Sequence, residues 1–498
     1  MNEAPLYNSY GSLARYIDAT PIAFFSFVAV LGFASLSISG GVIPNDTLAL
    51  WSGAIVAGDG QQSIGRIVAA YPTLPFMAAA AFEALAPAGT PVPALLASAL
   101  VGVLSWLWFM ALRAADLRFV TAVLATLLLA FHPAILRAAL AGPSEMLVAL
   151  FLFMLGNALF NLRERGAAPE VMVVSMALLG LTFSHPMGAA IACAAVPFLV
   201  FAVRPVLVAN SAFNVVLVLV FPTVFAVGAF TYVSWIFPGD GWSFYSAPAE
   251  SLAAWAVGVS HLFGGGITGV HAIDAALAFA CAILLGAPLA IVAVRQVSRR
   301  RPLFAPPVVL AASAVTAVAI SVATGLFGDP AAVAVVAPVL SAIAIIRLPT
   351  IREHTGHMMA LLVIGWLGGA LALALVDPRA ATQITGLEPR AGRERIDALN
   401  IGHASIGKNG ILIDTDNAPA AVIGRANARG LLTPASEKFA LTILLSRLDT
   451  PFVAIPNPQS NTGARDRLAL TFPLLYRDGA PGYRLIYQND TWRLFARN

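Results

Sequence analysis

The sequence predicts an α-helical polytopic membrane protein with a small C-terminal α/β domain. Of its 498 residues, 59% are hydrophobic and 11% are charged, whereas a soluble domain has roughly 25% charged residues. Mean hydropathy is +0.83. Apolar runs of membrane-spanning length recur up to residue 376, and polar residues are frequent beyond it. We therefore predict a membrane domain over 1–376 and a separate domain over 377–498.

Eleven apolar segments each approach the ~20 residues that a spanning helix needs. They lie near 21–39, 92–112, 118–135, 145–161, 170–185, 187–203, 212–236, 271–294, 304–326, 329–347 and 357–376. No cleavage site follows the first segment, so we interpret it as an uncleaved anchor. The run at 73–86 is short, is flanked and broken by proline, and contains Glu83. We expect it to form an interfacial or re-entrant helix.

Arginine placement predicts the orientation of these spans. Twelve arginines fall in alternate connections, namely Arg15, Arg113, Arg118, Arg163, Arg165, Arg204, Arg295, Arg299, Arg300, Arg301, Arg347 and Arg352. The opposite connections up to residue 376 hold only Arg66 and Arg137. Because positive residues are retained in the cytoplasm, we expect a cytoplasmic N-terminus, with the loop 40–91 and the C-terminal domain outside. The number of crossings is hardest to read at the tight turn 184–186, where a miscount would reverse the side assigned to every later loop.

Composition indicates the cellular location of the protein and excludes some classes of ligand site. Lysine is scarce and alanine abundant, which suggests a high-GC bacterium, hence an inner-membrane protein with a periplasmic domain. A net charge of +4 does not indicate a nucleic-acid partner. Cys193 and Cys281 lie in apolar runs and are predicted to be small buried side chains without a disulfide. The sequence has no Gly-rich nucleotide-binding loop and no Cys or His cluster.

The C-terminal domain has alternating strand and helix patterns. We predict short strands at Gly410–Asp414, Ala421–Gly424 and Phe452–Ile455, and a helix from Ser436, its N-cap, to Arg447. Tyr483–Tyr487 and Thr491–Ala496 predict a terminal hairpin. The run Asp414-Thr415-Asp416-Asn417 lacks the downstream positions of a calcium loop, so we interpret it as a strand end and turn.

The loop 40–91 carries the most informative residues. Asp46 follows the first span, and Trp51, Ala54 and Gly58-Asp59-Gly60 come after it. The segment Tyr71-Pro72-Thr73-Leu74-Pro75 lies later in the same loop. An ionisable group at a membrane surface is a functional hypothesis by default. The alternative is that Asp46 only caps the short helix that follows it.

This arrangement resembles the GT-C glycosyltransferases, which are polytopic enzymes that transfer sugars from polyprenyl-phosphate donors, of the mannosyltransferase or aminoarabinose transferase type. The local match covers roughly residues 21–90. The resemblance implies that Asp46 is the general base that activates the acceptor, because inverting transfer needs one carboxylate to take the acceptor's proton. The family often has two acids at this position, whereas here Asn45 and Thr47 flank a single one.

Other residues are candidates for substrate contacts. Glu145 begins the fourth span and resembles the family's second acidic site, where it would orient the acceptor or bind a divalent metal ion. The alternative is that Glu145 only stabilises the first turn of its helix by interacting with the helix dipole. Arg66 and Arg137 are expected to match the charge of the donor phosphate, unless each pairs with an acid or a lipid headgroup. Additional substrate-binding candidates are Tyr71, His185 and His132. Nothing has the spacing of a dedicated metal site, so metal dependence stays open.

The expected function is transfer of a sugar from a polyprenyl-phosphate donor to a lipid, glycan or protein acceptor at the periplasmic face. Two other classes of protein fit the composition. A secondary transporter or lipid flippase would place its charged groups near the midplane, and the apolar spans here carry few charges. A noncatalytic envelope-assembly scaffold would act through its tail domain.

Overall fold

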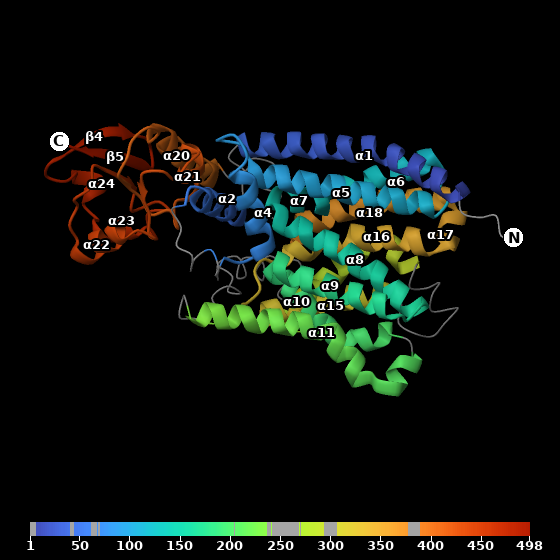
Figure 1. Cartoon of the computed structure of the whole chain (residues 1–498). Helices are drawn as coiled ribbons and strands as arrows, with labels where there is room; N and C mark the ends of the chain where they lie inside the picture. Colours follow the sequence, from blue (N-terminus) through green and yellow to red (C-terminus); the bar gives the residue numbers. More distant parts are fainter. Residues whose placement is uncertain are drawn as a thin grey trace. The chain divides into compact units, whose positions relative to one another are not determined.

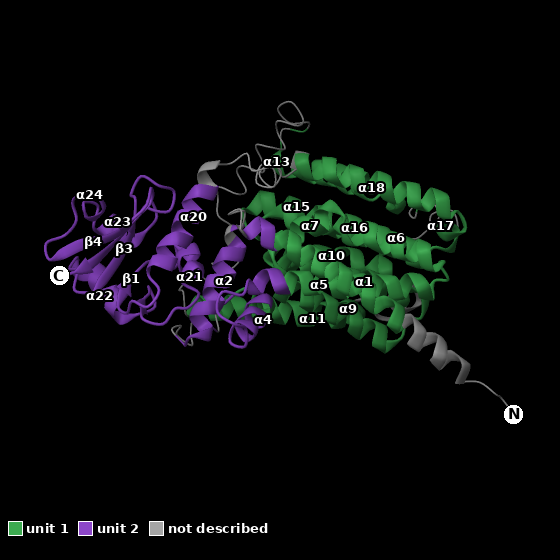
Figure 2. Ribbon diagram, turned by 90° about the horizontal axis from the view of Figure 1, so that it is seen from above, with its two compact units in different colours: residues 1–34, 71–74, 96–381 green, residues 35–70, 75–95, 382–498 purple. Residues whose placement is uncertain are grey.

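The computed structural model describes residues 6–39, 44–60, 67, 70–203, 205–236, 241, 268, 270–292, 306–376 and 389–498. The chain forms two compact units (Figure 2). Unit 1 contains residues 1–34, 71–74 and 96–381, and unit 2 contains 35–70, 75–95 and 382–498. Unit 2 therefore joins most of the loop 40–91 to the C-terminal tail.

Unit 1 is a bundle of apolar helices (Figure 1). Its elements are most of α1 (Leu6–Ser39), then α5 (Val92–Ala114), α6 (Phe119–Ala130), α7 (Pro133–Ala141), α8 (Pro143–Glu164), α9 (Ala168–Ser184), α10 (Pro186–Ala202), α11 (Pro205–Ile236), α13 (His271–Gly286), α15 (Pro306–Thr324), the 3₁₀ helix η1 (Pro330–Val335), α16 (Val336–Arg347), α17 (Pro349–Glu353) and α18 (Thr355–Val376). Each predicted span overlaps one or two of these helices. Among the described residues, seven helices are long and apolar enough to cross a membrane, or eight if the bent pair α6–α7 is one span.

The two ends of the bundle differ in their charged residues. At one end, which we call the arginine end, Arg347 donates to Asn157 Oδ1 at 3.0 Å, Arg163 donates to the Val203 carbonyl, and Arg352 donates to the Ala115 carbonyl. The other end, which we call the acidic end, carries Glu145 and Asp329. The connection at His185 separates two distinct helices, α9 and α10, which pack against each other.

Small residues let helices of unit 1 approach closely. A methyl group added at Gly368 of α18 would lie 2.2 Å from the Leu285 carbonyl oxygen of α13. One added at Gly365 would lie 2.8 Å from the Gly286 carbonyl oxygen. Close backbone approach through small residues is how membrane helices gain packing energy, because lipid tails are as apolar as the side chains.

The prediction that both cysteines are buried is wrong. Cys193 on α10 and Cys281 on α13 are exposed on the surface of the bundle, and both are free. The apolar sequence around them does not distinguish the two environments. In a membrane domain an outward face is as apolar as the interior, because it meets acyl chains rather than water.

Unit 2 contains a five-stranded sheet in the order β2-β1-β3-β5-β4. The strands are β1 (Ile411–Leu412), β2 (Leu431–Leu432), β3 (Phe452–Pro456), β4 (Tyr483–Gln488) and β5 (Trp492–Arg497). Strand β1 runs parallel to β2 and β3, with Ile411 opposite Leu431 and Phe452. Strand β5 runs antiparallel to β3 and to β4, which confirms the predicted terminal hairpin.

Helices cover both faces of this sheet. Residues of α2 (Asn45–Gly58), α20 (Pro389–Ala404) and α21 (Pro419–Arg425) share one apolar core with the sheet. Residues of α22 (Glu437–Leu445), α23 (Arg467–Thr471) and α24 (Leu475–Asp478) share the other. Unit 2 also holds most of α4 (Thr73–Glu83), which at 11 residues is too short to span a membrane.

Two local predictions for the tail have opposite outcomes. Ser436 is the N-cap of α22 and accepts a hydrogen bond from the Phe439 amide at 3.3 Å, as predicted. The predicted strand Ala421–Gly424 is wrong, because these residues belong to α21, which begins with Pro419 at its first position. A run of four apolar residues fits a buried strand or a buried helix equally well by periodicity.

Helix α2 of the first loop completes one core of the tail domain. Its side chains Leu48, Trp51, Ile55 and Val56 are buried together with residues of α20, α21 and the sheet. At the end of the helix, Asp59 accepts a hydrogen bond from the Ala428 amide at 2.7 Å and pairs with Arg429 at 3.1 Å. The loop and the tail, far apart in sequence, therefore form one folding unit.

We predict that Trp51→Ala destabilises unit 2 by about 3–5 kcal/mol, the usual cost of removing a large buried aromatic side chain. Hydrogen exchange of full-length protein in nanodiscs should then show faster exchange in peptides that contain β1 and β3. Leu445→Ala is the control, since Leu445 is 66% exposed and surface changes usually cost less than about 0.5 kcal/mol. Equal protection in the two variants would contradict the packing of α2 into the tail core.

Candidate functional site

Four polar side chains gather at the acidic end of unit 1. They are Arg137 on α7, Glu145 in the first turn of α8, His185 between α9 and α10, and Asp329 just before η1. Arg137 is 8% exposed, Glu145 5% and His185 7%. We call these four residues the Arg137 cluster.

Arg137 joins two carboxylates from different parts of the chain. Its Nη1 donates to Oε2 of Glu145, and its Nη2 donates to Oδ2 of Asp329 at 3.1 Å. Gly142, with φ of 104°, allows the sharp turn that sets α7 against α8. This turn brings together two side chains that lie eight residues apart in the sequence.

The cluster contains one guanidinium and two carboxylates, so its formal charge is about −1 when both acids are ionised. Arg137 is thus already matched by acidic partners inside the protein. A ligand that donates hydrogen bonds or brings positive charge suits this environment better than an unaccompanied phosphate. The role of Arg137 as a donor-phosphate ligand stays a prediction.

Asp329 is the site residue that the sequence analysis missed. Its Oδ1 accepts a hydrogen bond from the Ala331 amide at 2.8 Å and so caps η1. An aspartate directly before a proline is a recognisable helix start, and that signal was present in Gly328-Asp329-Pro330. The contact with Arg137 had no such signal, since it spans 192 residues.

His132 and His185 have the same local role. In each, Nδ1 accepts a hydrogen bond from the amide two residues later, of Ala134 at 3.2 Å and of Met187 at 3.0 Å. Each caps a helix whose first residue is proline. Since Nδ1 is an acceptor, the neutral imidazole carries its proton on Nε2. His185 also approaches the chain next to Asp329, because a methyl group at Gly328 would lie 3.7 Å from its Cε1.

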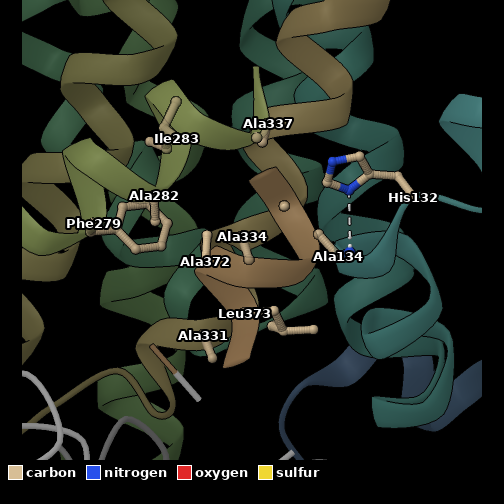
Figure 3. A pocket seen from close by; sticks show the side chains of 12 residues that line it. His132, Ala134, Phe279, Ala282, Ile283, Ala331, Ala334, Ala337, Ala372 and Leu373 are labelled. Carbon is tan, nitrogen blue, oxygen red and sulfur yellow. Dashed lines mark hydrogen bonds between the residues drawn. The ribbon is translucent and has the colours of Figure 1, made fainter. Parts of the chain in front are cut away.

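An apolar cavity lies beside His132 (Figure 3). It is bordered by α7, α13, η1, α16 and α18, and it shares α7 and η1 with the Arg137 cluster. Its lining is apolar apart from the imidazole: Ala134, Phe279, Ala282, Ile283, Gly286, Ala331, Ala334, Ala337, Gly369, Ala372 and Leu373 accompany His132. An apolar lining of this kind does not suit a charged group.

The remaining predicted site residues lie elsewhere. Tyr71 belongs to unit 1, where its hydroxyl donates to the Thr182 carbonyl at 2.7 Å and its ring packs edge-on against Phe230. Asp46 belongs to unit 2, in the first turn of α2, with an exposed side chain. The N-cap of α2 is Pro44, whose side chain forms no capping hydrogen bond. Arg66 lies outside the described residues.

A second acid of unit 2 lies at the opposite end of α2. Glu83, at the end of α4, lies about 4.0 Å from the position of a methyl group on Gly58. Burial raises its pKa to about 7, the neighbouring Trp51 indole lowers it, and the charge of Asp59 raises it. Helix α2 rises 1.5 Å per residue, so Glu83 and Asp46 lie on the order of 18 Å apart along its axis. They do not form a carboxylate pair.

No metal centre is evident in the parts of the chain that the structure describes. Among them, no group of three or more His, Cys, Asp or Glu side chains is arranged to hold an ion. Glu145 and Asp329 both use oxygens to bind Arg137. The possible divalent metal ion therefore has no assigned ligand set.

We predict that Arg137→Gln destabilises unit 1 by about 3–5 kcal/mol, because it leaves the buried Glu145 carboxylate without its cation. Arg165→Gln is a matched control. Arg165 is 71% exposed and its distance to Glu170 is 3.7 Å, and exposed pairs contribute about 0–1 kcal/mol. Unfolding of full-length protein in detergent, followed by tryptophan fluorescence, gives both values. A similar small loss for both variants would mean that Arg137 is not a structural ion pair.

Comparison with known proteins gives no family assignment. No protein-family model matches the chain, and no curated protein is similar to it.

Proposed function

We propose that this protein is a glycosyltransferase that moves a sugar from a polyprenyl-phosphate donor to an acceptor at the outer face of a bacterial inner membrane. The observation that carries the proposal is the setting of Asp46. Its carboxylate is exposed in the first turn of α2, directly after the first membrane helix. A general base needs an accessible carboxylate that substrate can reach.

The proposed topology has eleven crossings. Eight of them are the long or bent spans. The other three are α9, α10 and α13, which have 17, 17 and 16 residues. These lengths are near the lower limit of ~17 residues for a spanning helix. The arginine end would then be cytoplasmic by the positive-inside rule. The acidic end, the loop 40–91 and the tail would be periplasmic.

In this proposal Asp46 takes the proton from an acceptor hydroxyl. The acceptor oxygen forms a bond to the anomeric carbon of the sugar while the bond from that carbon to the phosphate oxygen breaks. Polyprenyl phosphate leaves with the bonding electron pair, and the configuration at the anomeric carbon inverts. The acceptor is a lipid, glycan or protein with a free hydroxyl or amine.

The Arg137 cluster is proposed to bind sugar or acceptor hydroxyls. Glu145 and Asp329 accept hydrogen bonds, and the side chain of Asp329 is 36% exposed. Arg137 donates to both acids and so fixes their orientation. Arg66, rather than the already matched Arg137, is then the better candidate for the donor phosphate.

A transporter or lipid flippase is the second candidate, and one observation favours it. Helices α6 and α7 are bent by 51° at a short break, and His132 at that break borders the apolar cavity. Broken helices near a buried polar group are common in transporters. Substrate flux across sealed vesicles without a new covalent product would favour this candidate over the transferase.

We predict that Asp46→Asn lowers sugar transfer by about 10²–10⁴-fold, the usual contribution of a general base. Transfer is measured in vesicles with a radiolabelled polyprenyl-phosphate sugar, and the thermal stability of the purified variant should equal that of the wild type. Asp490→Asn is the control, because Asp490 is an exposed acid in the turn of the tail hairpin. Full transfer by a folded Asp46→Asn protein would exclude the proposed mechanism.

A further inference from the structure

A second acidic site lies inside the tail domain, at the carboxyl end of its central parallel strand. Strand β1 lies between β2 and β3 and runs parallel to both. The connecting helices α21 and α22 lie on opposite faces of the sheet. The chain therefore reverses its winding direction at β1, and the carboxyl end of such a strand is where functional groups of α/β sheets commonly lie.

Asp414 follows β1 at this end and is fully buried. Its Oδ2 accepts hydrogen bonds from the Arg467 amide at 3.0 Å and from Asn417 Nδ2 at 2.9 Å. Its Oδ1 is buried and has no hydrogen-bond partner in the described structure. The guanidinium of Arg467 is 4.0 Å from Oδ2 and turns toward Asp416, at 3.1 Å.

Asp466 is also fully buried and is the N-cap of α23. Its Oδ1 accepts a hydrogen bond from the Ala469 amide at 2.9 Å. Its Oδ2, like Oδ1 of Asp414, is buried and has no partner in the described structure. The two carboxyl groups bind amides of the same five-residue helix, at Arg467 and Ala469, so they are close neighbours.

Two ionised carboxylates cannot remain buried side by side without a cation or a donor for each oxygen. The only cation that faces the pair, Arg467, does not reach either unpartnered oxygen among the contacts of the described residues. One shared proton removes one of the two negative charges and gives both unpartnered oxygens a hydrogen bond, because a protonated carboxyl donates and the neighbouring carboxylate accepts.

We propose that Asp414 and Asp466 share one proton at the carboxyl end of β1, and that this proton is released when the domain unfolds. Burial raises the pKa of Asp466 to about 7; the Ala469 amide lowers it, the charge of Asp414 raises it, and the Leu468 amide and Arg467 lower it. The unfolded aspartate has a pKa of about 3.9. The folded domain thus holds a proton that the unfolded chain loses, and its stability falls as pH rises from about 4 to 7.

The test compares wild-type protein with Asp466→Asn, Asp414→Asn and the double variant. In either single variant the amide oxygen keeps the backbone hydrogen bonds, and the amide nitrogen donates to the remaining carboxylate. We expect both single variants to fold. In the double variant two amide nitrogens face each other without an acceptor, so we expect the least protection of all at every pH.

Protection is measured by hydrogen exchange of peptides from β1 and α23, in full-length protein in nanodiscs between pH 5.5 and 8. After correction for intrinsic exchange, one bound proton changes the opening equilibrium about tenfold per pH unit below 7. Asp466→Asn should remove that tenfold dependence. Glu83 in the same unit has a similarly raised pKa, so every variant is made in a Glu83→Gln background.

Three results would overturn the proposal. The first is an unchanged pH dependence in Asp466→Asn. The second is a double variant as well protected as the single variants. The third is loss of wild-type protection on adding EDTA and its return with Ca²⁺ or Mg²⁺, since the oxygens would then hold a cation rather than a proton.

Discussion

The need to satisfy helix starts inside an apolar bundle shapes the acidic end of this protein. The first amides of a helix have no partner within the helix, and lipid offers none. Here His132, His185 and Asp329 each accept a hydrogen bond from an amide two residues later. Proline follows each of them and removes one further donor. The polar atoms required by three helix starts thus accumulate on one side of the bundle, where Arg137 and Glu145 also lie.

The carboxylates of the chain differ mainly in what balances their charge. Glu145 is buried and bound to the Arg137 guanidinium, so removal of that partner is costly. Asp46 is exposed to solvent. Asp414 and Asp466 are buried, and one oxygen of each has no hydrogen-bond partner in the described structure; in our proposal a shared proton lies between them. Position in the sequence does not distinguish Glu145, Asp46 and Asp466, because each precedes or begins a helix.

Sequence periodicity predicted the elements better than their associations. The apolar helices were predictable because a membrane helix must be apolar over its whole length, and Ser436 because a helix cap has a local signature. The pairing of Arg137 with Asp329 was not, since nothing local encodes a contact across 192 residues. The outward cysteines were missed because an apolar run does not say which of its faces meets lipid. The Ala421–Gly424 error arose because four apolar residues carry no decisive period.

The packing of α2 changes how the role of the tail can be tested. Trp51 is 4% exposed because α20, α21 and the sheet cover it. Deleting the tail would expose this apolar face and release the helix that carries Asp46. An inactive tail-deleted protein is therefore expected whether the tail is a scaffold, binds the acceptor, or only holds α2 in place. Point changes on the exposed surface of the tail separate these roles, because they leave the α2 core intact and alter only what the domain can bind.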